Sequence, residues 1–295
     1  MSRRDGAPLR LATRSSPQAT AQANAIRAQL VEAGIAAELV FVDTEGDRTQ
    51  AAQVPLHSIG GLGVFTREIQ TAVLDGRADA AVHSAKDLPT DTHPALCIAA
   101  IGARRDARDA LIGARRNTLA DGATVATGSV RRRAQLHEVR PDLHFVELRG
   151  NVGTRLVRIP AGGAIVMAVA ALQILELSDR IDEVLDPEYF VPAVGQGAVA
   201  VECRVDDHAT RDALATVNDP ATYDAVSVER AWLGELGSGC SSPVGAHVVD
   251  GTLWAFLAGD TGVQRRQIDL VGDPRVDRAA ATTLASAMRD AAMVR

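Results

Sequence analysis

Short apolar runs and amphipathic stretches alternate along the first third of the chain, which is typical of strands that are each followed by a helix. We expect strands at 9–13, 38–42, 78–82 and 96–101, and helices from 17 to a stop at Gly34 and from about 64 to a stop at Gly76. Ser16 is the predicted N-cap of the first helix, with Pro17 at its first position. This alternation predicts a mostly parallel sheet.

A second block of the same kind follows a break in the pattern at 102–109, where we place a hinge. Its expected elements are strands at 124–126, 143–148 and 164–169, a helix from Ser129 and a short helix after 153. The segment 191–197 predicts a second crossing, followed by a strand at 198–203 with a helix behind it.

The pattern of elements changes in the last part of the chain. A helix over 220–236 leads into a loop of small residues, and three short alternating strands follow near 244–249, 252–258 and 264–270. A terminal helix is expected from about Pro274. This pattern predicts a small α+β module of roughly 75 residues, which is within the ordinary size range of a domain.

The composition is typical of a protein with more than one core. At 295 residues and 46% hydrophobic, the chain can form two or three domains. The net charge of -6 argues weakly against a general nucleic-acid binder, because no basic excess is available to neutralise phosphates. Cys97, Cys203 and Cys240 form no C-x-x-C pair, so neither a zinc site nor a disulfide framework is indicated. Without an apolar leader or a run of about 18 apolar residues, we expect a cytoplasmic protein that spans no membrane.

Lys86 is the only lysine, and the other 30 of the 31 basic residues are arginine. Coding bias toward arginine could leave one lysine by chance, but the neighbourhood of Lys86 favours a function. It follows an apolar run and precedes Leu88-Pro89, which predicts a strand that ends in a loop, where open α/β sheets bind ligands. The adjacent Asp87 is either a structural ion-pair partner or a catalytic carboxylate that surrounding cations keep ionised.

Arginines stand where three predicted strands end. They are Arg14 after the first strand, Arg131, Arg132 and Arg133 after the turn Thr127-Gly128-Ser129, and Arg149 and Arg155 around the turn 150–154. Amide hydrogens and the helix dipole at such turns attract anions, and arginine binds carboxylates and phosphates with two hydrogen bonds. We therefore expect a ligand with several acidic groups. The alternative is a solvated helix face, for which Arg133 is the best example.

Cys240 lies in a polar loop of small residues, Gly-Ser-Gly-Cys-Ser-Ser-Pro, unlike the apolar strands around Cys97 and Cys203. An accessible thiol is a candidate nucleophile or attachment point, and the alternative is an incidental exposed cysteine. The stretch 60–63, Gly-Gly-Leu-Gly, is a poor dinucleotide fingerprint because its spacing is wrong. We interpret His83 as a packed strand residue rather than a ligand.

Six segments carry a resemblance to a known family. They are Ala12-Thr13-Arg14-Ser15-Ser16-Pro17, His83-Ser84-Ala85-Lys86-Asp87-Leu88-Pro89, Leu148-Arg149-Gly150-Asn151-Val152-Gly153-Thr154-Arg155-Leu156, Pro192-Ala193-Val194-Gly195-Gln196-Gly197-Ala198, Val201-Glu202-Cys203-Arg204, and Gly239-Cys240 followed by Pro243. In this order, and across nearly the whole chain, they resemble the hydroxymethylbilane synthase family, also called porphobilinogen deaminase.

The resemblance implies an α/β fold with two lobes like those of periplasmic binding proteins and a small C-terminal α+β domain. The first domain would comprise 7–103 and 197–217, the second 104–196 and the third 218–295, with the active cleft between the first two. Hinges near 103–108 and 192–198 would let the lobes adjust as the product chain lengthens.

The resemblance also implies a transferase of porphyrin biosynthesis. It would add four porphobilinogen molecules in turn to a dipyrromethane cofactor, release ammonia each time, and free 1-hydroxymethylbilane by hydrolysis. A thioether would join the cofactor to Cys240, and no metal is needed. Asp87 would assist the loss of ammonia, stabilise the cationic methylene-pyrrolenine and help deprotonate the new carbon–carbon junction. Each pyrrole bears an acetate and a propionate, which agrees with the arginines.

The other site residues follow from the matched motifs. The cofactor is expected to contact Lys86, Thr127, Gly128, Ser129, Arg131 and Arg132, and the substrate Arg14, Ser16, Gln22, Phe65, Arg149, Arg155 and Gln196. The expected partners are porphobilinogen and the polypyrrole intermediates, with no nucleic acid, and the expected state is a monomer. Leu62 and Ile174 depart from the family, because basic residues are common at both positions.

Two other interpretations stay open at this point. A non-catalytic binding or sensor protein with the same two lobes would use the arginines for an anionic small molecule and would need neither Asp87 nor Cys240. A pyridoxal-phosphate enzyme would use Lys86 as a Schiff base, although Asp87 is not the ring-nitrogen partner that such chemistry requires.

Overall fold

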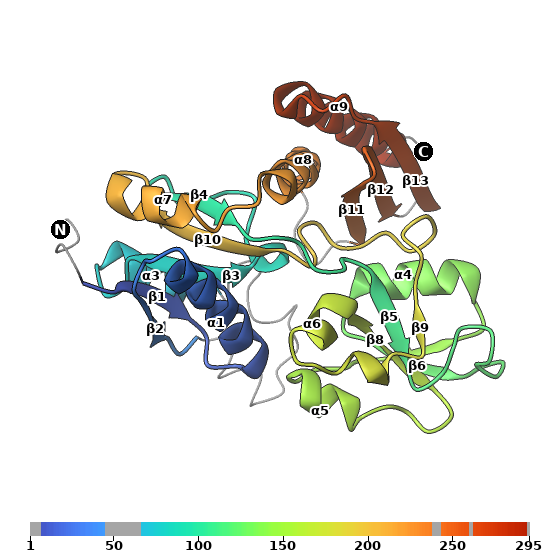
Figure 1. Ribbon diagram of the computed structural model, residues 1–295. Coiled ribbons are helices and arrows are strands. Elements are labelled where there is room, and N and C mark those ends of the chain that lie inside the picture. The colour runs from blue at the N-terminus through green and yellow to red at the C-terminus, as the bar shows by residue number, and fades with distance from the viewer. Residues whose placement is uncertain (1–6, 45–65, 238–242, 260–261, 294–295) are drawn as a thin grey trace. The chain divides into compact units, whose positions relative to one another are not determined.

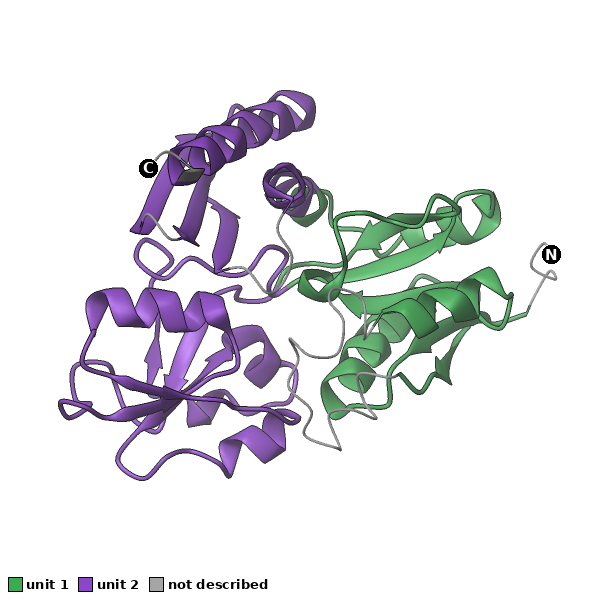
Figure 2. Cartoon of the chain, turned by 180° about the vertical axis from the view of Figure 1, so that it is seen from behind, with its two compact units in different colours: residues 1–104, 198–223 green, residues 105–197, 224–295 purple. Residues whose placement is uncertain are grey.

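The computed structural model describes residues 7–44, 66–237, 243–259 and 262–293. The chain divides into two compact units, of which unit 1 comprises 1–104 with 198–223 and unit 2 comprises 105–197 with 224–295 (Figure 2). The chain therefore crosses from unit 1 to unit 2 at the first predicted hinge region, returns to unit 1 at the second, and enters unit 2 again within helix α8 (Pro220–Leu236). Residues 224–295 group with unit 2, and the division into three domains stays a prediction.

Unit 1 contains a 5-stranded sheet of order β2-β1-β3-β10-β4 (Figure 1). Its strands are β1 (Leu9–Thr13), β2 (Ala37–Phe41), β3 (Ala80–Ser84), β4 (Leu96–Ile101) and β10 (Val199–Arg204). β1 pairs in parallel with β2 and β3, whereas β10 pairs antiparallel with β3 and β4. Four strands thus run in one direction, which confirms the predicted mostly parallel sheet. β10 runs against them because it enters at the end of β3, where Val199 pairs with Ser84.

Helices cover both faces of this sheet. They are α1 (Pro17–Glu32), α3 (Arg67–Leu74) and α7 (His208–Ala215), with a single 3₁₀ turn, η2 (Ala85–Asp87), after β3. The predicted cap of α1 is confirmed, because the Ser16 side chain accepts a hydrogen bond from the amide of Ala19 and Pro17 is the first helical residue. The predicted start of α3 near 64 lies outside the described residues, and its described part begins at Arg67.

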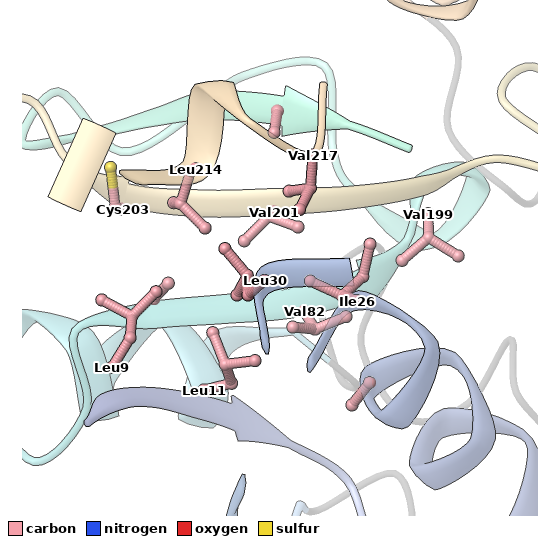
Figure 3. Close-up of a cluster of buried hydrophobic side chains, with 13 residues drawn as sticks. Leu9, Leu11, Ile26, Leu30, Val82, Val199, Val201, Cys203, Leu214 and Val217 are labelled. Carbon is pink, nitrogen blue, oxygen red and sulfur yellow. The ribbon is translucent and has the colours of Figure 1, made fainter. Parts of the chain in front are cut away.

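The main core of unit 1 lies on one face of the sheet. Ile26 and Leu30 of α1 pack there with strand residues such as Leu11, and Leu214 of α7 joins the same cluster (Figure 3). Each of these leucines or isoleucines contributes roughly 1.5–3 kcal/mol by leaving water. α3 packs on the opposite face through Ile69 and Val73. Cores on both faces hold the sheet rigid, which positions the loops at its edge.

Unit 2 contains a second 5-stranded sheet, of order β7-β6-β8-β5-β9. Its strands are β5 (Asp109–Ile112), β6 (Thr124–Ala126), β7 (His144–Val146), β8 (Ala164–Ala168) and β9 (Glu183–Val184). Its helices are α4 (Val130–Val139), α5 (Val152–Leu156) and α6 (Val169–Gln173), followed by the 3₁₀ turn η3 (Ser178–Arg180). β5 and β9 were not predicted, because their apolar runs are short and polar residues flank them.

The two sheets share one topology. In unit 1, β1 lies between β2 and β3, and in unit 2, β6 lies between β7 and β8. In each sheet, one strand that follows a crossing between the units pairs antiparallel with both of its neighbours. β10 has this place in unit 1 and β5 has it in unit 2. The predicted α/β class, with two separate α/β sheets, is therefore confirmed.

The C-terminal part has its own antiparallel sheet. Its elements are α8 (Pro220–Leu236), β11 (Val244–Val249), β12 (Thr252–Gly259), β13 (Gly262–Asp269) and α9 (Pro274–Met293). Trp232 of α8, Phe256 of β12 and Met288 of α9 are fully or almost fully buried. The predicted α+β module is thus confirmed. Among the described residues, no helix is both long and apolar enough to cross a bilayer.

Candidate active site

In unit 1, predicted site residues gather where β1 and β3 end. Arg14 and Ser16 follow β1, and Lys86 and Asp87 follow β3 in the turn η2. β1 and β3 are parallel neighbours, so their carboxyl ends lie at the same edge of the sheet. This is the edge at which open α/β sheets bind ligands. The structure therefore brings these four residues to one edge of unit 1, as the sequence predicted.

The turn that carries Asp87 is anchored on two sides. The hydroxyl of Ser84 donates a hydrogen bond to Oε1 of Gln22 on α1 at 2.9 Å. The amide of Ala85 donates to the carbonyl of Ala198, at the start of β10, at 3.0 Å. Asp87 itself is half-buried. Gln22, predicted as a substrate residue, thus has an observed contact within the protein, and its role toward substrate stays a prediction.

In unit 2, the turn Thr127-Gly128-Ser129 joins β6 to α4. The amide of Ser129 donates to the hydroxyl of Thr127 at 3.2 Å, and the Ser129 hydroxyl accepts from the amide of Arg132, so Ser129 is the N-cap of α4. Gly128 has little room for a side chain, because a β-carbon there would lie 3.1 Å from the carbonyl oxygen of Leu148. The turn is therefore tight, and its backbone lies at the carboxyl edge of the unit 2 sheet.

Arg131 and Arg132 are almost fully buried inside unit 2, where they share the carboxylate of Asp109. Arg131 Nη2 lies 2.7 Å from Oδ2, and Arg132 binds Oδ1 through Nε at 3.0 Å and Nη2 at 2.7 Å. Nε2 of Gln196 donates to the same Oδ1 at 3.0 Å. Burial alone would raise the pKa of Asp109, but the two guanidiniums outweigh it and lower this pKa to about 2. We name these four residues the Asp109 cluster.

The sequence interpretation missed Asp109. It predicted that Arg131 and Arg132 face a ligand, whereas much of their hydrogen bonding is to protein atoms, including the carbonyl of Val191 and that of Val166. Their cofactor-binding role stays a prediction. An acidic residue directly before the apolar triplet Ala110-Leu111-Ile112 was the available signal, because a charge at the start of a buried strand requires a partner.

Arg149 lies on the loop between β7 and α5, and Arg155 lies in the last turn of α5. Gly150 has a positive φ of 118°, and its carbonyl accepts from Nε of Arg155 at 2.7 Å. Asn151 caps α5 by accepting from the amide of Thr154. Nη1 of Arg149 is buried and has no hydrogen-bond partner among the described residues. A buried guanidinium nitrogen without an acceptor favours an anion as its missing partner.

Other predictions about single residues have clear outcomes. His83 is a packed strand residue, because it is 5% exposed and lies 3.2 Å from the buried carboxylate of Glu202. Arg133 forms an exposed pair with Glu147, so the solvated interpretation is confirmed for it. Phe65, Leu62 and Cys240 lie outside the described residues.

The strand that follows the predicted attachment residue Cys240 is described. It is β11, and Gly245 on it is five residues after Cys240 in the sequence. A β-carbon on Gly245 would lie 3.1 Å from Cδ of Arg131. Strand β11 therefore packs against Arg131 of the Asp109 cluster.

Comparison with known proteins identifies the family. Residues 9–212 match the family model described as "Porphobilinogen deaminase, dipyromethane cofactor binding domain". A porphobilinogen deaminase of Acidothermus cellulolyticus is 49% identical over 247 residues, or 81% of this chain and 74% of the relative. Another, of Sorangium cellulosum, is 45% identical over 272 residues, or 88% of this chain and 90% of the relative. The chain belongs to the porphobilinogen deaminase family.

Family membership confirms the resemblance stated from the six motifs, together with the transferase class and the dipyrromethane cofactor. It favours the enzyme over the non-catalytic binding protein. Solved structures with a similar arrangement include the methionine-binding protein MetQ and a periplasmic substrate-binding protein of Coxiella burnetii, each 13% identical with a TM-score of 0.45. They cover 73% and 75% of this chain, and this chain covers 92% and 96% of theirs.

The described residues fit a dipyrromethane. Such a cofactor bears several carboxylates, and unit 2 offers the unpartnered Nη1 of Arg149 and two buried arginines that share one acid. No cluster of three or more histidine, cysteine or acidic side chains suited to a metal ion occurs in the described part of the chain. The donors present are therefore those for a polycarboxylate.

Proposed function

We propose that this chain is a hydroxymethylbilane synthase, which joins four porphobilinogen molecules head to tail, releases one ammonia per addition and frees 1-hydroxymethylbilane by hydrolysis. The observation that carries this proposal is the position of Asp87 at the carboxyl edge of the unit 1 sheet, together with family membership over most of the chain. A sensor would bind the same anions but would not need a carboxylate there.

Asp87 would be the catalytic residue. Ammonia departure leaves positive charge on the pyrrole ring of the substrate, and a fixed carboxylate stabilises that charge electrostatically. The same carboxylate would accept the proton that is lost when the new carbon–carbon bond restores the aromatic ring. The hydrogen bonds of Ser84 and Ala85 restrict the turn, so the backbone that carries Asp87 is positioned before the charge develops.

The arginines would bind and orient the acidic side chains of the pyrroles. Arg14 and Ser16 of unit 1, with Arg149 and Arg155 of unit 2, would bind substrate, as would Gln22, Phe65 and Gln196. Lys86, Thr127, Gly128, Ser129, Arg131 and Arg132 would contact the cofactor, which Cys240 would hold through its sulfur. When bound, the dipyrromethane supplies the free ring position to which the first new pyrrole is joined.

The remaining expectations belong to the same proposal. The enzyme would act as a cytoplasmic monomer of three domains, without nucleic acid, and its net charge of -6 is consistent with the last point. Ile174, a half-buried residue directly after α6, would leave one carboxylate of a longer intermediate without an arginine.

Replacing Cys240 tests the attachment. Native protein from a porphyrin-producing host should be heavier than its sequence by a dipyrromethane, and Cys240→Ser should have the bare mass. Cys203→Ser is the matched control, because its thiol is buried in β10, and it should keep the extra mass. If the pyrroles stayed on Cys240→Ser, another residue would be the attachment point, and a bare native protein would overturn the function.

A further inference from the structure

The Asp109 cluster is unbalanced in charge. It contains two guanidiniums and one carboxylate, and the side chains of Arg131 and Arg132 are only 5% and 7% exposed. Within the described parts of the chain, Asp109 is the one carboxylate that pairs with either arginine. Burial lowers the pKa of Arg131, which Asp109 only partly opposes. A buried excess of positive charge is costly until an anion balances it.

Asp109 is held in place through both its backbone and its side chain. It is the first residue of β5 and fully buried, and its carbonyl accepts from the amide of Leu185 at 2.8 Å. Gln196, from the second crossing, fixes the carboxylate from another side and also binds the carbonyl of Ala107 at 2.7 Å. The carboxylate therefore has little freedom to rotate.

A fixed carboxylate determines where the arginines point. Both arginines are in the first turn of α4, directly after the Ser129 N-cap. Arg132 binds Asp109 through two nitrogens, which defines the plane of its guanidinium as well as its position. Arg131 is bound through one terminal nitrogen to Asp109 and through the other to the carbonyl of Val191. Neither guanidinium can turn without losing a buried hydrogen bond.

We propose that Asp109 is a positioning residue for cofactor assembly: it presets Arg131 and Arg132 so that their excess charge receives the carboxylates of the incoming pyrroles. This inference rests on the proposed function and deepens it. The packing of Gly245 against Arg131 places the cluster beside the strand that follows Cys240, which is where such a site is needed. Asp109 itself does not touch the pyrroles.

The test measures how fast the folded apoprotein acquires its cofactor. Native chain, Asp109→Asn and Asp109→Glu are produced in a host that makes no porphobilinogen, and the folded fraction is isolated by size exclusion. Porphobilinogen is then added, and the gain of the dipyrromethane mass is followed by intact mass spectrometry. Asp109→Glu keeps the negative charge but displaces the carboxylate by one methylene, so it separates charge balance from positioning.

We expect both variants to load at least about tenfold more slowly than the native chain, because a small misplacement of binding groups costs this much or more. Asp142→Asn is the matched control, since Asp142 forms a similar two-nitrogen pair with Arg140 next to the far end of α4, and it should load at the native rate. If Asp109→Asn does not fold, the loading rate of Asp109→Glu alone tests the positioning role.

Each contrary result has a distinct meaning. Normal loading of folded Asp109→Glu would assign Asp109 to charge balance alone and overturn the inference. Equally slow loading of Asp142→Asn would overturn it too, because any disturbance of α4 would then suffice. If the native apoprotein gains no pyrrole mass, the proposed function itself fails.

Discussion

We expect the difference in stability between the native chain and an Asp109→Asn variant to depend on pH. Asp109 is fully buried, and its two arginines lower its pKa to about 2 in the folded state. An unfolded aspartate titrates near about 3.9. The folded protein therefore binds the Asp109 proton more weakly than the unfolded chain does, so this carboxylate stabilises the fold above the unfolded pKa. Its contribution is lost as the pH falls through the folded value.

The size of the effect follows from the two pKa values. Lowering the pKa of Asp109 from about 3.9 to about 2 corresponds to roughly 2–3 kcal/mol of unfolding free energy at pH 7. By pH 3 about half of this free energy should already be lost. The variant lacks the group and cannot show this loss. At neutral pH it should be less stable by about 3–5 kcal/mol, because Arg131 and Arg132 are then buried without their acid.

Urea unfolding followed by circular dichroism at pH 7, 5 and 3 measures these free energies for both proteins. Other carboxylates titrate alike in the two and cancel in the difference. The difference in unfolding free energy should shrink by roughly 1 kcal/mol between pH 7 and pH 3. A difference that is constant with pH would refute the reasoning, because Asp109 would then not be an ionised partner of the arginines.

Two further predictions concern single side chains. Arg149→Gln should raise the KM for porphobilinogen about 10- to 100-fold, which is the cost of losing a charged hydrogen bond. Little stability should be lost, because Nη1 of Arg149 has no acceptor among the described residues. Arg180→Gln, at an exposed arginine, is the control, and equal KM values for the two variants would exclude Arg149 from substrate binding. Iodoacetamide should alkylate half-exposed Cys97 well before Cys203, because burial and the neighbouring Cys97 raise the pKa of the Cys203 thiol to about 12. Peptide mapping measures the order of alkylation, and a faster reaction at Cys203 would contradict the prediction.

Local signals in the sequence were enough for the starts of α1 and α4. The N-caps at Ser16 and Ser129 involve side chains and amides only three residues apart, so a short window of sequence contains the whole interaction. The gathering of Arg14 and Asp87 at one edge also followed from the order of strands and helices, because parallel neighbours end together.

Contacts between distant residues were beyond such reasoning. Asp109 is 22 and 23 residues from the arginines that it pairs with, and 87 from Gln196, so nothing in its own neighbourhood identifies these partners. The reversed direction of β10 has the same origin, because it depends on where the chain re-enters the sheet. The arginines were therefore recognised as a group, while the acid that orients two of them was not.

The central claim is that Asp87 drives stepwise addition of pyrroles to a chain held on Cys240. Holoenzyme mixed with a small excess of porphobilinogen and acid-quenched at intervals should show masses rising by one pyrrole unit at a time, with one ammonia released per step. Asp87→Asn should keep the cofactor mass but stay there, with most of its turnover lost. If the native protein released no ammonia and showed no added pyrrole, or if Asp87→Asn advanced at the native rate, the account would be contradicted.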